Sequence, residues 1–155
     1  MTKKQIYLPI LRILKYSVLI LSAYLFACTS SNENDIDDIK AYLELNNIPA
    51  IDTLGVFVQI SEAGSEEKPS PSSTIELAYT GRYLDGEIFD QTKDGATTKL
   101  SLTSAIPGLQ SGLRLFGKNG NGSIYIPSNQ AYGANPPFGV RKNAILVFDI
   151  EVKDF

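Results

Sequence analysis

Few side chains in this sequence are suited to acid–base, nucleophilic or metal chemistry. The sequence has no histidine and a single cysteine, Cys28. The usual zinc ligands and the Ser-His and Cys-His nucleophile pairs are therefore missing, and one cysteine excludes an intramolecular disulfide. We expect no metal and no cofactor, and any chemistry must proceed without these residues.

Cys28 follows a segment with the layout of a secretory signal. Basic residues come first, an apolar run fills residues 17–27, and no acidic residue occurs before Glu33. The residues Leu25-Phe26-Ala27-Cys28 resemble a bacterial lipobox, so we predict a lipoprotein signal peptide at residues 1–27 and diacylglycerol on the Cys28 thiol. A pair of acyl chains holds a protein stably on a bilayer. An uncleaved N-terminal anchor and a free thiol are the alternatives.

Loss of residues 1–27 changes the charge of the protein. It removes four of the 14 basic residues and none of the 17 acidic ones, which leaves a net charge of −7. Such a chain is not expected to bind nucleic acid. By resemblance to other lipoproteins, Thr29 in place of an aspartate favours the outer membrane, on its periplasmic face or at the cell surface. The predicted location is therefore the cell envelope.

The length of 155 residues suits one modest domain with a short appendage. Residues 28–35 are small, polar and acidic, and are expected to form a flexible tether. Residues 36–69 are expected to be an N-terminal extension with an amphipathic helix at residues 35–47, a strand at residues 54–60 and an exposed loop. Packing against the main domain is the expected role of this helix, with partner binding as the alternative.

Residues 70–155 carry the pattern of a compact α+β domain. Residues 74–84 alternate apolar and polar side chains, and Asp85-Gly86 then predicts a hairpin turn into a strand at residues 87–90. Further strands are expected near residues 100–102, 123–127 and 144–154, with a helix after Pro107 and a loop at residues 128–143. This order favours a curved antiparallel β-sheet wrapped around one short α-helix.

Five motifs in this region resemble the FKBP-type peptidyl-prolyl cis/trans isomerase family in order and approximate spacing. They are Leu77-Ala-Tyr-Thr-Gly81, Asp85-Gly86 with Phe89-Asp90, Ala105-Ile-Pro-Gly108, Ala131-Tyr-Gly133 and Leu146-Val-Phe-Asp149. The match covers about residues 70–155. Residues 42–60 loosely resemble the leader of bacterial lipoprotein members, including those linked to gliding motility.

The resemblance implies a catalytic pocket for a proline ring, with aromatic and aliphatic walls and a carboxylate at the edge. The Tyr132 hydroxyl and the Ile106 backbone N–H would donate hydrogen bonds to substrate carbonyls. Core packing is the alternative role for each aromatic ring. The catalytic residues implied are Tyr79, Phe89, Asp90, Ile106, Tyr132 and Phe148, with Ala105, Leu109 and Val140 in substrate contact.

Two departures from the family pattern bear on activity. Leu109 stands where many members have a tryptophan at the floor of the pocket, and the arginine that often pairs with the carboxylate is absent near residues 93–95. The resemblance implies a monomeric isomerase that acts on proline-containing polypeptides and assists the folding of exported envelope proteins. A non-catalytic proline-peptide binding or chaperone module, an architectural lipoprotein and a small-molecule carrier are the alternatives.

Overall fold

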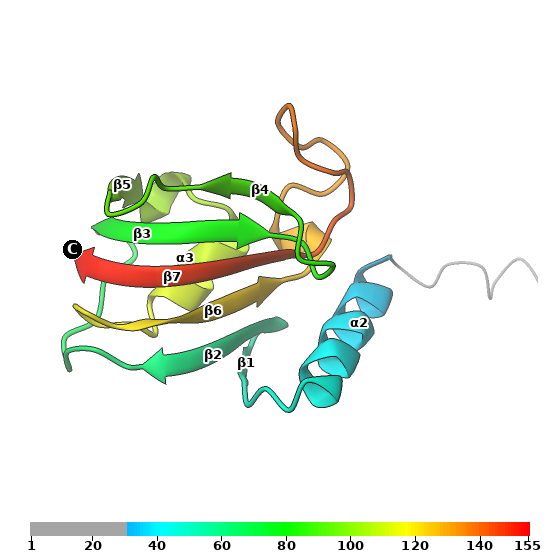
Figure 1. Ribbon diagram of the computed structural model, residues 1–155, viewed down its shortest axis with the longest axis horizontal. Coiled ribbons are helices and arrows are strands. Elements are labelled where there is room, and N and C mark those ends of the chain that lie inside the picture. Colours follow the sequence, from blue (N-terminus) through cyan, green and yellow to red (C-terminus); the bar gives the residue numbers. More distant parts are fainter. Residues whose placement is uncertain (1–30) are drawn as a thin grey trace, which may run out of the picture. The chain divides into compact units, whose positions relative to one another are not determined.

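Seven antiparallel strands form one sheet within residues 31–155, the part of the chain that the computed structural model describes (Figure 1). The predicted signal peptide and Cys28 lie outside these residues. The sheet has the order β1-β2-β6-β7-β3-β4, and β5 pairs with β3 beside β4. The strands are β1 (Ile51–Thr53), β2 (Val56–Glu62), β3 (Thr74–Arg82), β4 (Ile88–Gln91), β5 (Thr98–Ser101), β6 (Asn121–Ile126) and β7 (Leu146–Asp154).

The central strands bury side chains on both faces of the sheet because successive side chains point to opposite sides. In β2, Val56 and Val58 enter the main hydrophobic core, whereas Phe57 between them enters a second cluster. Strands β6 and β7 repeat this division, with Tyr125 and Val147 in the second cluster. The sheet is therefore the middle layer between two apolar clusters.

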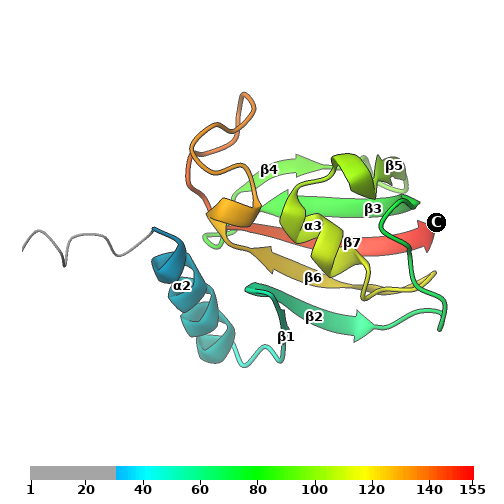
Figure 2. The same cartoon turned by 180° about the vertical axis from the view of Figure 1, so that it is seen from behind.

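Helix α3 (Pro107–Leu113) covers the face of the sheet that carries the main core (Figure 2). Pro107 occupies its first position, where the missing N–H costs no helical hydrogen bond. Two glycines let the helix approach the sheet closely: a Cβ atom would lie 2.3 Å from Ile126 Cγ2 at Gly108, and 2.6 Å from Ile124 Cγ2 at Gly112. Side chains from α3 and the sheet therefore pack into one core that adjoins the predicted site.

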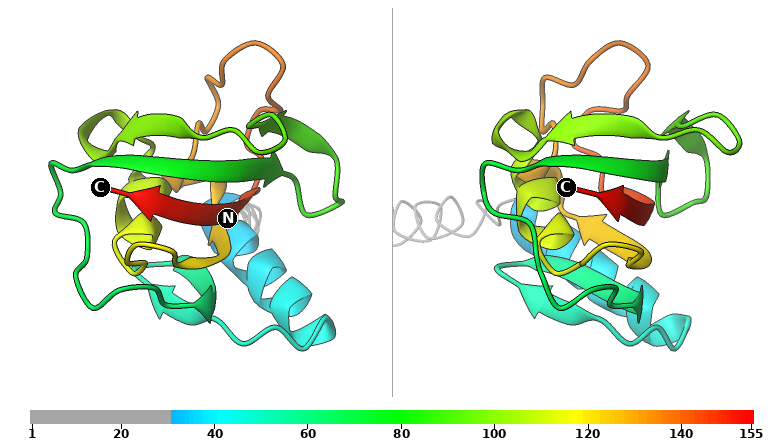
Figure 3. Two further views of the ribbon diagram at one scale, coloured as in Figure 1. Left: turned by 60° about the vertical axis from the view of Figure 1, so that its left-hand side comes forward. Right: turned by 90° about the vertical axis from the view of Figure 1, so that its left-hand side faces the viewer.

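Helix α2 (Ser31–Leu45) packs on the opposite face, beside β1 and β2 (Figures 1 and 3). Ile39 and Leu43 are buried there against the second cluster. The helix begins at Ser31, so residues 31–35, which we expected in a flexible tether, are helical. Asp35 lies within this helix, and its carboxylate accepts hydrogen bonds from the backbone N–H and hydroxyl of Ser128. Among residues 31–155, no helix combines the length and the apolar character needed to cross a bilayer.

The α+β fold predicted from the sequence is confirmed, with additional elements. Strand β1 and the 3-10 turns η1 (Leu102–Ser104) and η2 (Ser128–Gln130) were not expected. Strand β2 lies inside the sheet between β1 and β6, and Val56 and Val58 are fully buried in the main core. Side chains from residues 36–69 and from residues 70–155 therefore contribute to one hydrophobic core.

Candidate functional site

Strands β3, β4 and β7 and the residue that follows β3 bring four aromatic rings together at one end of the main core. Phe89 of β4 meets Phe148 of β7 edge to face, with ring centroids 5.7 Å apart and an interplanar angle of 85°. Tyr79 of β3 lies 6.0 Å from Phe148, and Tyr83 lies 5.2 Å from Phe89. Edge-to-face and tilted pairs at these distances are favourable because the ring edge is positive and the ring face is negative. The arrangement forms a continuous aromatic wall, defined here as Tyr79, Tyr83, Phe89 and Phe148.

Gly81 makes the close contact between β3 and this wall possible. A Cβ atom at Gly81 would lie 2.7 Å from Phe89 Cζ and 3.3 Å from Phe148 Cε1. The Phe89 ring therefore occupies the space that any other residue at position 81 would fill. The sequence placed Gly81 in a family motif, and the structure supplies a physical reason for the residue.

Tyr79 and Asp90 form a hydrogen-bonded pair at the edge of the wall. The Tyr79 hydroxyl donates to Asp90 Oδ2 at 2.5 Å. Burial first, then the hydrogen bond and the negative charge of Asp90, raise the pKa of Tyr79 well above its usual value. Tyr79 therefore keeps its proton as the donor. Within residues 31–155 Asp90 forms no ion pair, which agrees with the absence of the arginine noted in the sequence.

Tyr132 follows the turn η2 and stands 37% exposed at the same site. Burial of part of its ring and the charge of Asp90 both raise the pKa of Tyr132. The hydroxyl is therefore protonated at neutral pH and is a hydrogen-bond donor that can reach solvent.

The segment that enters α3 provides the aliphatic side of the site. Ala105 and Ile106 are half-buried against the main core, and Leu109 is buried in the first turn of the helix. The Ile106 carbonyl accepts hydrogen bonds from Leu109 and Gln110. No hydrogen bond within the described residues uses the Ile106 N–H as donor, so this group is available to a ligand.

Sequence reasoning missed Tyr83 and Arg141 as parts of this arrangement. The Arg141 guanidinium lies 4.1 Å above the Tyr83 ring centre and forms ion pairs with Asp85 at 2.6 Å and Glu87 at 2.5 Å. The backbone N–H of Arg141 also donates a hydrogen bond to the Tyr83 hydroxyl at 2.9 Å. These contacts fix the segment next to Val140, which packs against the main core. The alternation of residues 74–84 had placed Tyr83 on the core face, but no local signal indicated its partner 58 residues later.

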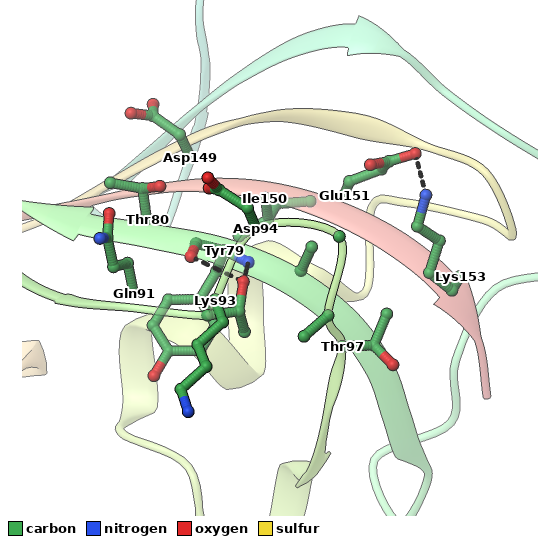
Figure 4. A pocket seen from close by; sticks show the side chains of 14 residues that line it. Tyr79, Thr80, Gln91, Lys93, Asp94, Thr97, Asp149, Ile150, Glu151 and Lys153 are labelled. Atoms are coloured by element: carbon green, nitrogen blue, oxygen red, sulfur yellow. Dashed lines mark hydrogen bonds and ion pairs between the residues drawn. The ribbon is translucent and has the colours of Figure 1, made fainter.

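A separate cavity of about 420 Å³ lies against the outer side of β3 and β7, under the loop at residues 92–97 (Figure 4). Ala78, Thr80, Asp149 and Glu151 line it. Figure 4 shows the Tyr79 ring extending away from the side chains of Thr80, Asp149 and Glu151. Of the nine predicted pocket residues only Tyr79 borders this cavity. Among residues 31–155, no group of three or more His, Cys, Asp or Glu residues is placed to hold a metal ion.

Comparison with known proteins decides the family. The profile of FKBP-type peptidyl-prolyl cis-trans isomerases matches residues 65–153. The chain belongs to this family. FKBP-type relatives include FkpA of Escherichia coli K12, 37% identical over 101 residues, and the probable FkpA of Neisseria meningitidis, 35% identical over 102 residues. Outer membrane protein MIP of Legionella longbeachae is 32% identical over 100 residues.

These matches cover part of each relative. The alignments to the two FkpA proteins span 64% and 63% of this chain but 37% of either relative, so the chain spans little more than a third of their length. The crystal structure of Escherichia coli FkpA has a TM-score of 0.69 at 27% identity, with 99% of this chain and 73% of that chain covered. An isomerase structure from Pseudomonas syringae has a TM-score of 0.66 at 27% identity and covers 79% and 93%.

Proposed function

We propose that this FKBP-type chain is a peptidyl-prolyl cis/trans isomerase. The observation that carries the proposal is the aromatic wall beside two hydrogen-bond donors, the Tyr132 hydroxyl and the Ile106 N–H, which has no acceptor within residues 31–155. The proline ring would lie against Phe89 and Phe148, and the two donors would bind carbonyl oxygens of the peptide. Asp90 holds the Tyr79 hydroxyl and so fixes one end of the wall.

The mechanism requires no acid, base or metal. Rotation about an Xaa-Pro bond faces a barrier of about 18–20 kcal/mol, because the planar amide is stabilised by resonance. The planar amide is charge-separated, whereas the twisted amide is less polar and is favoured by an apolar wall that removes water. These contacts must stabilise the twisted state more than the planar one. A 10⁶-fold acceleration requires about 8 kcal/mol of this difference.

Binding without catalysis is the second candidate function, and two observations favour it. Asp90 lacks the arginine partner that the family often supplies, and Leu109 replaces the tryptophan floor with a smaller side chain. Loss of an aromatic contact removes about 1 kcal/mol beyond the change in buried area. A weakened floor would hold the peptide less firmly while rotation occurs, and the chain would then act as a proline-peptide binding or chaperone module.

The cellular setting belongs to the same proposal. A lipid on Cys28 would attach the domain to the cell envelope, on the outer membrane, as a monomer that acts on exported polypeptides. The lipobox-like residues support the lipid, and the name of the Legionella relative supports an envelope location. Metabolic labelling with palmitate tests the lipid directly: incorporation in the natural chain and none in Cys28→Ser is expected, and equal labelling would contradict it.

The isomerase proposal is tested with a short Xaa-Pro peptide and the chain from residue 29 onwards, which contains all of the compact unit at residues 31–155. The wild type is compared with Phe89→Ala and Tyr132→Phe. We expect acceleration in the wild type, loss of it in Phe89→Ala and a reduction in Tyr132→Phe. Peptide binding without acceleration, across several residues before proline, would support the binding module instead.

A further inference from the structure

We propose that helix α2 positions Tyr132 for the reaction through a hydrogen-bonded link from Asp35 to Ser128. This inference rests on the proposed isomerase function and deepens it. Asp35 lies outside residues 65–153, the part of the chain that the family profile matches. Through this link, a segment outside the matched residues would help to support the site.

Ser128 binds α2 with both of its hydrogen-bond donors. Its backbone N–H lies 2.8 Å and its hydroxyl 2.5 Å from the same carboxylate oxygen of Asp35, 93 residues away. Ser128 is 3% exposed, and apart from tyrosines it is the one buried polar or charged residue within the described residues. Buried donors need acceptors, and Asp35 is the acceptor that permits this burial.

The carbonyl oxygen of Ser128 holds the backbone on either side of Tyr132. It accepts hydrogen bonds from the N–H of Ala131 at 3.1 Å and from the N–H of Gly133 at 2.9 Å. Gly133 adopts the left-handed region at φ 55°, and its carbonyl accepts from the N–H of Asn143 at 2.8 Å. A movement of Ser128 would therefore displace the peptide groups that flank Tyr132.

The other end of the turn η2 is also attached to the N-terminal part of the chain. Gln130 Nε2 donates to the carbonyl oxygen of Leu54 at 2.8 Å, in the turn between β1 and β2. Gly55 lies close to both α2 and η2, because a Cβ atom there would be 3.4 Å from Ile36 Cδ1 and 3.5 Å from Gln130 Nε2. Both ends of η2 are thus held by residues 35–55.

Tyr132 depends on this support because its own packing is incomplete. At 37% exposure, its ring is held by fewer neighbours than the buried ring of Phe148. The reacting groups of an enzyme must be held closely, and a displacement of about 1 Å by a distant change can lower the rate by about 10²-fold. The link is therefore expected to act on kcat, which depends on Tyr132 during rotation, more than on KM.

The test compares Asp35→Ala with Asp37→Ala in the chain from residue 29 onwards. Asp37 is exposed on the same helix, and its side chain forms no hydrogen bond or ion pair within residues 31–155, so the second variant makes the same charge change without the link. We expect Asp35→Ala to lower kcat for the Xaa-Pro peptide about fivefold, with KM within about twofold. Asp37→Ala should match the wild type.

A double-mutant cycle separates positioning from general destabilisation. If Asp35 acts through Tyr132, Asp35→Ala should cause no further loss of kcat in a Tyr132→Phe background. An additive loss, or equal kinetics in Asp35→Ala and Asp37→Ala, would overturn the proposal. Should Asp35→Ala fail to fold, Ser128→Ala replaces it, because this variant removes the hydroxyl that donates to Asp35 and retains the backbone N–H bond. It should likewise lower kcat, and wild-type kinetics would overturn the proposal.

Hydrogen exchange at the amides of Ala131 and Gly133 gives a readout that does not depend on catalysis. The proposal predicts faster exchange at both amides in Asp35→Ala than in Asp37→Ala, and unchanged exchange would overturn it. A wild type that does not isomerise the peptide contradicts the proposed function itself. The exchange measurement then decides the link between α2 and Tyr132 separately.

Discussion

Replacement of Gly81 by alanine tests whether the aromatic wall must keep its observed geometry. The new methyl group would lie 2.7 Å from Phe89 Cζ and 3.3 Å from Phe148 Cε1, whereas carbon atoms in contact are about 3.5–4.0 Å apart. The Phe89 ring must therefore retreat by about 1 Å. Gly81 does not have a positive φ, so the change places the strain on the ring rather than on the backbone.

The magnitude follows from two opposing effects. Overpacking costs about 1–3 kcal/mol, and the lower entropy of alanine in the unfolded chain offsets about 0.5–1 kcal/mol of it. We expect a net loss of about 1–2 kcal/mol in the free energy of unfolding. The displaced ring should lower kcat/KM by about tenfold to hundredfold, equivalent to about 1.4–2.7 kcal/mol of transition-state stabilisation.

The assay is kcat/KM for an Xaa-Pro peptide, measured beside the thermal midpoint of unfolding. Gly120→Ala is the control, because its methyl group would lie 2.9 Å from the carbonyl oxygens of Ala63 and Gly117, just before the start of β6 and away from the wall. This control should lose stability and keep kcat/KM within about twofold of the wild type. A folded Gly81→Ala variant with wild-type kcat/KM would refute the role given to the wall.

Three further results are expected. Leu54→Gly should raise the free energy of unfolding by about 0.5–1 kcal/mol in a denaturant titration, because Leu54 adopts φ 57° and is 87% exposed, so glycine relieves backbone strain and loses little packing. A loss of stability would show that the Leu54 backbone is not strained. Ile39→Ala should lower the free energy of unfolding by about 2–4 kcal/mol, because Ile39 of α2 is fully buried in the second cluster. A loss below about 1 kcal/mol would show that α2 packs loosely on the sheet. The pKa of Tyr79 is raised in the folded chain, so its stabilising contribution is complete below about pH 10 and is lost as the pH rises above that value. Unfolding followed against pH should show this decline, and Tyr79→Phe should make it shallower; an identical profile in the two proteins would contradict the shift.

Strict alternation of apolar and polar residues predicted the central strands well. The pattern in residues 74–84 placed Ile75, Leu77 and Tyr83 on one face, and all three are buried in the main core. Strand β1 escaped prediction because it has only three residues and is joined to β2 through Leu54 in a left-handed conformation that favours glycine or asparagine. The local signs of this turn are Gly55 at φ 82° and Asp52, whose carboxylate accepts from the Gly55 N–H, but Leu54 at the left-handed position conceals them.

The site was less accessible to sequence reasoning than the fold. The motifs identified the wall residues Tyr79, Phe89 and Phe148, and the structure brings their rings together. The supports of the wall come from distant pairs, such as Arg141 with Tyr83 and Asp35 with Ser128, which are 58 and 93 residues apart. Such pairs depend on the tertiary fold, so a single sequence has no spacing rule that reveals them.

Exchange spectroscopy by NMR can show whether this chain accelerates rotation about an Xaa-Pro bond. A proline peptide in large excess over the chain from residue 29 onwards gives separate cis and trans signals, because uncatalysed exchange takes about 10–100 s. We predict exchange cross-peaks between these signals in the presence of the wild type, and weaker ones with Phe89→Ala. Peptide signals that shift on binding without cis–trans exchange would contradict the account.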